Sequence, residues 1–192
     1  MAGLAITFAH SLFKAALFMI VGAIDHATGT RDIHELSGLG RKQPLLATLA
    51  VISAASMAGI PPLFGFVAKE TALDAILHEE LLVGMPGKIT LVVLVAGSIL
   101  TMAYSLYFVY GAFATKGQPW ADGQSPAVRD MHYPGPKLWL SPAVLTACTV
   151  GFGLLPAGLS TPLNEDLDGR FPDVEGAELA PVSYTHLRAH ET

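Results

Sequence analysis

Two lysines occur where the sequence is otherwise apolar. Lys14 is the only charged residue among residues 1–24, and Lys69 follows the adjacent prolines Pro61 and Pro62. An ammonium group at the middle of a lipid bilayer costs about 2.5–3.5 kcal/mol on insertion scales, so such residues usually face the protein interior and mark a path for ions or protons. We therefore interpret Lys14 and Lys69 as residues that bind and release protons within a membrane.

Each lysine also has a structural alternative. Lys14 could form an ion pair with a helix outside this sequence, and Lys69 could extend its ammonium to an outer surface while burying only its stem. Burial disfavours the charged form of an amine, so a nearby charge could switch its protonation, as proton transport requires. Glu70 adjoins Lys69 but points elsewhere, because residues i and i+1 of a helix do not face each other.

The polar residues before Lys14 share one helix face with it. Thr7, His10, Ser11 and Lys14 are spaced i, i+3, i+4 and i+7, which aligns their side chains along one side of an α-helix. Because this face turns apolar beyond Lys14, we predict a hydrated half-channel that reaches the lysine from the outer side. His10 could relay protons, since an imidazole both donates and accepts, or it could be a hydrogen-bonded packing residue.

Long charge-free stretches surround these residues. The chain has 192 residues, of which 52% are hydrophobic and 14% charged, with a mean hydropathy of +0.49, and few soluble domains have this composition. Residues 45–68, 89–115 and 138–164 contain no charged residue, and each is long enough for the about 20 helical residues that a bilayer core requires. Together with residues 1–24, they predict an all-α, multi-pass transmembrane helix bundle of about four spans within residues 1–158.

The second of these spans contains a strong helix breaker. The run Gly59-Ile60-Pro61-Pro62 cannot continue a helix without losing backbone hydrogen bonds. Residues 45–78 therefore form either one interrupted crossing or two crossings joined by a tight turn. Non-helical backbone at membrane depth is tolerated where it faces protein or a water-filled cavity, so the break also predicts a polar cavity.

Charge placement favours one interrupted crossing. It puts loops 25–44 and 115–137, with six basic residues, on one side, and loop 81–88 and the acidic tail, with two, on the other. Two separate crossings would give four basic residues on each side. Because basic loops favour the cytoplasm, we predict one discontinuous helix, with loops 25–44 and 115–137 cytoplasmic and the acidic segment 159–181 outside.

Several other classes of function have no support in the sequence. Cys148 is the only cysteine, and the histidines have no spacing typical of a zinc site, so we expect no metal and no cofactor. The acidic segment 159–181 argues against a nucleic-acid partner, and no set of nucleophile, base and orienting group suggests a hydrolase. Residues 182–192, VSYTHLRAHET, resemble a translated sequencing-library adapter, and we expect them to be an artefact.

Two longer motifs resemble a known family. The runs AHSLFKAALFMIVGAIDHATGTRDI and SMAGIPPLFGFVAKE closely resemble the antiporter-like subunits shared by respiratory complex I, membrane hydrogenases and Mrp antiporters. The variant with DHATGTRD and MAGIPP is most similar to the large A subunit of Mrp-type multisubunit Na+/H+ antiporters. The resemblance spans about residues 1–155, and it implies that the chain is a fragment, without the family's earlier half and its continuation.

The resemblance also implies roles for individual residues. Lys14 and His10 match the lysine and histidine of the family's H-x-x-x-K motif, Lys69 matches the lysine after the discontinuous helix, and Glu70 occupies the acidic or amide position beside it. In the family these residues belong to a hydrated chain of ionisable groups across the middle of the membrane. We expect the fragment alone to conduct nothing, because the residues that would drive the protonation of Lys14 are missing.

The resemblance implies a plasma-membrane location, with the lipid bilayer and other subunits of a multisubunit antiporter as partners and H+ and Na+ as transported ions. It favours an ion antiporter subunit over an enzyme. One alternative is a proton-pumping membrane subunit of an NADH:quinone oxidoreductase or a membrane hydrogenase. The other is an inert structural scaffold whose lysines are paired.

Overall fold

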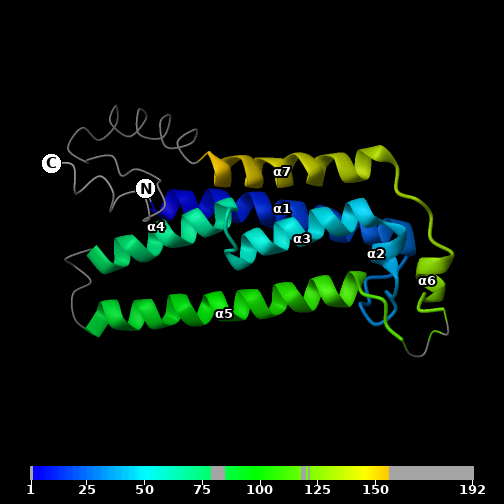
Figure 1. The fold of residues 1–192 in the computed structure, drawn as a ribbon, viewed down its shortest axis with the longest axis horizontal. Coiled ribbons are helices and arrows are strands. Elements are labelled where there is room, and N and C mark those ends of the chain that lie inside the picture. The colour runs from blue at the N-terminus through cyan, green and yellow to red at the C-terminus, as the bar shows by residue number, and fades with distance from the viewer. Residues whose placement is uncertain (1, 79–84, 118–119, 121, 156–192) are drawn as a thin grey trace.

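A computed structural model of the chain describes residues 2–78, 85–117, 120 and 122–155, and these contain helices and no strand. Residues 81–84 of loop 81–88, the acidic segment 159–181 and residues 182–192 lie outside the described residues. Figure 1 shows the arrangement of the helices. The helices are α1 (Ala2–Thr28), α2 (Leu39–Lys42), α3 (Pro44–Ala58), α4 (Phe64–His78), α5 (Met85–Phe113), α6 (Pro126–Arg129) and α7 (Pro136–Leu154).

The long helices form a bundle along which the chain passes four times, through α1, through α3 and α4, through α5 and through α7. Helices α1, α5 and α7 are long and apolar enough to cross a membrane, and α3 is a shorter apolar helix. In Figure 1, α1 and α5 run in one direction, whereas α3 followed by α4, and then α7, run back. This arrangement confirms the predicted all-α bundle with one discontinuous helix. Helix α1 continues about one turn beyond its predicted end at Ile24.

The break between α3 and α4 has a specific local cause. Helix α3 ends at Ala58, and the following Gly59 has a left-handed φ of 85°, a backbone conformation that glycine adopts at helix ends without steric penalty. Pro61 and Pro62 follow, and α4 begins at Phe64. The backbone N–H of Ile60 still donates to the carbonyl of Ala55, at 3.0 Å. The predicted interruption is therefore confirmed.

Two glycines bring the backbone segments at the break into close contact. The backbone N–H of Gly65 donates to Ser56 Oγ at 3.1 Å, so a residue of α3 satisfies an amide at the start of α4. A Cβ at Gly65 would lie 1.8 Å from the Ser56 carbonyl oxygen, and one at Gly153 would lie 2.2 Å from the Pro62 carbonyl oxygen. The start of α4 thus packs beside the end of α3, and α7 covers the break.

The buried side chains form two clusters. One lies near the end that carries α2 and α6, and includes Ile20, Leu46 and Phe113. The other lies around the break and includes Phe13, Met57 and Phe64. Phe64 also packs edge to face against Phe8 of α1, with ring centroids 6.1 Å apart. Because α1 contributes to both clusters, it is the central helix on which Lys14 is held.

The two basic loops meet at one end of the bundle, as one interrupted crossing requires. Ser37 Oγ donates to the Gly123 carbonyl at 2.7 Å, and Lys42 Nζ donates to the Arg129 carbonyl at 2.6 Å. Lys116 Nζ donates to the carbonyls of Ile33, Leu36 and Gly111.

Lys116 thereby ties the end of α5 to the loop after α1. Burial lowers the pKa of Lys116, and the charge of Asp32 partly opposes this effect. Nearer α1, the Arg31 guanidinium donates to the carboxylate of Asp25 at 2.7 Å, and this bond raises the pKa of Arg31. Polar contacts therefore hold this end of the bundle together, whereas apolar contacts hold the long helices together.

Candidate functional site

Lys14 lies half-buried on α1 and contacts a tyrosine of α5. Its Nζ donates to Tyr104 Oη at 3.3 Å and lies 5.2 Å from the centroid of the tyrosine ring. A cation over an aromatic face is attracted by the ring quadrupole, so Tyr104 offers the ammonium both an acceptor and a π surface. Lys14 lines a cavity of about 170 Å³ together with residues of α1, α3 and α5. These residues are Leu17, Phe18, Val21, Met57, Tyr104 and Phe108.

Tyr104 was not predicted as a site residue. Aromatic residues near the end of a membrane helix commonly lie at the membrane interface, and Tyr104 belongs to the aromatic C-terminal part of α5. Tyr107 and Tyr110 are 60% and 67% exposed and fit that description, whereas Tyr104 turns its hydroxyl toward Lys14 and also donates to Met57 Sδ at 3.0 Å. The sequence does contain a pattern that places Tyr104 on a more polar face of α5, because Gly97, Thr101 and Tyr104 are spaced i, i+4 and i+7 and so share one side of the helix.

Lys69 lies at the break in the discontinuous helix. Its Nζ donates to the carbonyl of Ala58, the last residue of α3, at 3.0 Å. The carbonyl end of a helix carries a partial negative charge that favours a cation. The lysine stem lies against Gly59, where a Cβ would approach the lysine Cδ to 2.9 Å. The ammonium is therefore bound to backbone at the break, which does not fit the alternative of a side chain that extends to an outer surface.

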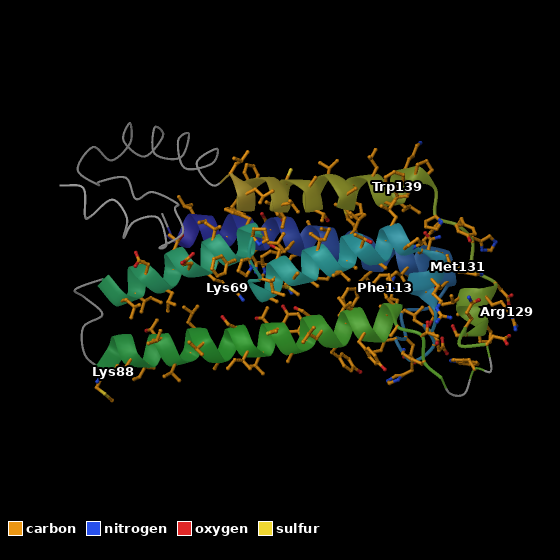
Figure 2. All side chains as sticks on the ribbon, viewed as in Figure 1. Lys69, Lys88, Phe113, Arg129, Met131 and Trp139 are labelled. Carbon is orange, nitrogen blue, oxygen red and sulfur yellow. The ribbon has the colours of Figure 1, made fainter. Side chains whose placement is uncertain are left out.

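A larger cavity, of about 340 Å³, lies beside Lys69 between α1, α4 and α5. In Figure 2, the Lys69 side chain points from α4 toward α5. Five polar side chains line the cavity among mainly apolar ones, namely His10, Lys69, Ser98, Thr101 and Tyr104. A cavity needs roughly 10–15 Å³ to hold one water molecule, so this volume can hold several.

His10 belongs to the cavity of Lys69. It is exposed on α1, lines that cavity, and packs edge to face against Phe13 with ring centroids 5.3 Å apart. Among the described residues, His10 does not line the smaller cavity that contains Lys14. The structure thus brings together His10 and Lys69, although His10 is only one helical turn from Lys14 in sequence. Its role as a proton relay stays a prediction.

The other predicted pathway residues have more local contacts. Thr7 Oγ1 donates to the Gly3 carbonyl at 2.8 Å, and Ser11 Oγ donates to the Phe8 carbonyl at 2.7 Å. Both residues are exposed on α1. Glu70 is half-buried on α4, next to Lys69. The roles of Thr7, Ser11 and Glu70 in the ion path therefore stay predictions.

A hydrogen bond between two buried hydroxyl groups joins α3 to α7. Ser53 Oγ and Thr146 Oγ1 share a hydrogen bond of 2.9 Å, and Thr146 also donates to the Pro142 carbonyl. Such hydroxyl pairs stabilise helix contacts in membranes, so the contact of Ser53 is one of helix packing. Within the described part of the chain, histidine, cysteine and carboxylate side chains do not gather in a group of three that could hold a metal ion.

The arrangement can hold protons at two separate amines. One amine is bound to a phenol and the other to a backbone carbonyl. An amine can lose its proton only if an acceptor or water reaches it, and each of these two lines a cavity. The geometry is therefore suited to proton binding and release, and it contains no arrangement of described residues typical of covalent catalysis.

The chain is similar to known membrane proteins over most of its length. Residues 1–101 match the family model described as NADH:quinone oxidoreductase/Mrp antiporter, TM. Curated relatives include Na(+)/H(+) antiporter subunit A1 of Staphylococcus haemolyticus, 40% identical over 160 residues, and that of Staphylococcus epidermidis, 38% identical over 160 residues. Each alignment covers 81% of this chain and 19% of the relative, so the chain spans about a fifth of the length of these proteins.

A solved structure is also similar. The Mrp complex from Dietzia sp. DQ12-45-1b contains a chain that superimposes with a TM-score of 0.74 and 30% sequence identity. The match covers 93% of this chain and 18% of that chain. The bundle described above is therefore a known arrangement of membrane helices.

Proposed function

This chain belongs to the NADH:quinone oxidoreductase/Mrp antiporter transmembrane family, and on this premise we propose that it is part of a membrane subunit that exchanges sodium ions for protons. The matched residues 1–101 include both motifs from which the sequence predicted the family. The apolar helices and the family together make the chain a multi-pass membrane protein. The exchange activity is proposed because the curated relatives are Na(+)/H(+) antiporter subunits.

The placement of Lys69 is the observation that carries the proposal. Its ammonium is bound to Ala58 at the carbonyl end of α3 and borders the larger cavity. Discontinuous membrane helices commonly use such ends to bind cations and protons. A lysine whose charge is stabilised by backbone, and which water can reach, is able to exchange its proton during a transport cycle.

The proposed mechanism is alternating protonation of the two lysines. Protons enter through water in the larger cavity, with His10 as a relay, and occupy Lys69 and Lys14 in turn. Charges in an interior of low dielectric constant interact strongly, so the occupancy of one lysine disfavours a proton on the other. This repulsion couples proton movement to the countermovement of sodium ions elsewhere in the subunit.

We also propose a location and partners for the subunit. The subunit lies in the plasma membrane with loops 25–44 and 115–137 in the cytoplasm and segment 159–181 outside, and it assembles with other subunits of a multisubunit antiporter. The packing of the two basic loops against each other supports a common side for them. The basic charge of these loops supports the cytoplasmic side.

Alanine substitutions in the complete subunit test the proposed function. Lys14→Ala and Lys69→Ala, each expressed with the partner subunits, are expected to abolish sodium/proton antiport in everted membrane vesicles while the complex still assembles. Lys137→Ala is the matched control, because Lys137 is exposed at the start of α7. Normal sodium resistance in cells that carry only a Lys14 or Lys69 variant would contradict the proposal.

The family description also covers a second candidate, a proton-pumping subunit of an NADH:quinone oxidoreductase. Such a subunit would move protons only when a quinone is reduced, and it would not require sodium ions. Proton movement in vesicles that depends on NADH and quinone, and not on a sodium gradient, would favour this candidate. The identity of the curated relatives favours the antiporter.

A further inference from the structure

We propose that Tyr104 holds Lys14 and relays protons between the cavity of Lys14 and the cavity of Lys69. This inference rests on the proposed function, because it assumes that protons pass between the two lysines. Tyr104 belongs to α5, whereas the lysines belong to α1 and α4. The tyrosine would therefore connect three helices along one path.

The two cavities meet at the tyrosine. Among the residues that the structure describes, the linings of the larger and the smaller cavity have two in common, Met57 and Tyr104. Met57 offers a thioether, which is only a weak hydrogen-bond acceptor and has no proton to donate. The phenol of Tyr104 is thus the group at this shared wall that can pass a proton from one side to the other.

The hydroxyl of Tyr104 already has both hydrogen-bonding roles that a relay needs. It accepts from Lys14 Nζ at 3.3 Å and donates to Met57 Sδ at 3.0 Å. Because a thioether is a weak acceptor, little hydrogen-bond energy is lost when the O–H turns away from Met57. The hydroxyl can then point to water in the larger cavity, where His10 and Lys69 also lie.

The proton transfer balances without any further reactant. The Lys14 ammonium gives one proton to Tyr104 Oη while the phenol releases its own proton to a water molecule in the larger cavity. Lys14 ends as a neutral amine, the phenol is neutral before and after, and the positive charge moves to the water. Rotation about the C–O bond of the tyrosine then returns the O–H to its starting direction.

One substitution distinguishes a relay role of Tyr104 from a packing role. Tyr104→Phe keeps the ring that lies over Lys14 but removes the hydroxyl that accepts from it. If the ring alone mattered, transport per complex would be unchanged. A hydrogen bond to a charged group can change an equilibrium at least tenfold. Loss of the hydrogen bond from Lys14 is therefore expected to lower the antiport rate per assembled complex about tenfold.

The experiment measures sodium/proton antiport as a function of pH in vesicles containing the complete complex, with rates divided by the amount of assembled subunit. Tyr107→Phe is the matched control, because Tyr107 lies one turn away and is 60% exposed. The expected result is a lower rate and a changed pH profile for Tyr104→Phe, and an unchanged profile for Tyr107→Phe. A normal rate and profile for Tyr104→Phe would overturn the inference.

A second variant decides the question if the phenylalanine variant assembles poorly. Tyr104→His restores a side chain that both donates and accepts, and its titration near pH 6.5 is expected to recover part of the rate with a new pH dependence. No recovery relative to Tyr104→Phe would overturn the inference. If Tyr104→Phe transports normally while Lys14→Ala is inactive, the relay fails and the proposed function stands. If Lys14→Ala is itself active, the proposed function fails.

Discussion

Lys69 of α4 donates a hydrogen bond of 3.0 Å to the carbonyl of Ala58, the residue at which α3 ends. The last carbonyls of a helix have no partner within it, and here a lysine from the following helix provides one. The same ammonium is the group that we propose to carry a proton. The contact therefore has two roles, one in stabilising the break and one in transport, and substitutions can separate them.

Arginine at position 69 should keep the first role and lose the second. The guanidinium can still donate to the Ala58 carbonyl, but it does not release its proton in proteins. We expect Lys69→Arg to assemble in normal amount and to lose antiport, measured as the sodium-dependent collapse of a proton gradient in everted vesicles. A wild-type rate for Lys69→Arg would mean that Lys69 only caps the end of α3.

Two glycines of α7 provide a matched test of the packing over the break. A Cβ at Gly153 would lie 2.2 Å from the Pro62 carbonyl oxygen, whereas a Cβ at Gly151 meets no atom within 4 Å. Forcing extra atoms into a packed site costs about 1–3 kcal/mol. We expect Gly153→Ala to lower the thermal unfolding temperature of the detergent-purified complex and Gly151→Ala to leave it unchanged. Equal stability of both variants would show that α7 does not pack on Pro62.

Single cysteines test the direction of the chain in the membrane. With Cys148 replaced by serine, Asp32→Cys and Arg129→Cys report on the two basic loops, and His78→Cys reports on the opposite end of the bundle. Asp32 and Arg129 are both exposed. We expect a membrane-impermeant maleimide to label the first two from the cytoplasmic face and His78→Cys from the outer face. Labelling of Asp32→Cys and Arg129→Cys from different faces would rule out one interrupted crossing.

The discontinuous bundle could be predicted because its causes are local in sequence. Charge-free stretches define the long helices, and adjacent prolines at Pro61 and Pro62 interrupt a helix whatever surrounds them. The distribution of basic residues also selected one interrupted crossing correctly. Lys14 could be proposed as a pathway residue because a charged residue within an apolar helix is unusual whatever its partners are. Lys69 could be proposed because it follows the interruption at Pro61 and Pro62.

The contacts between helices could not be predicted in this way. Tyr104 meets Lys14 because of how α5 is rotated and tilted against α1, and no local pattern determines that packing. His10 was expected near Lys14 because both lie on one face of α1, but the neighbouring helices divide that face between two cavities. The partner of Lys69 depends on how the start of α4 packs beside the end of α3, where Gly65 closely approaches Ser56.

The interruption after Ala58 also has an electrical consequence. The carbonyl groups that end α3 and the amide groups that begin α4 lie near each other, so peptide dipoles of two helix halves terminate within the bundle rather than at its surfaces. They create a field that depends on the course of the main chain and that persists when a nearby side chain is exchanged. A charge that arrives between α3 and α4 is thus guided partly by backbone that point mutations leave in place.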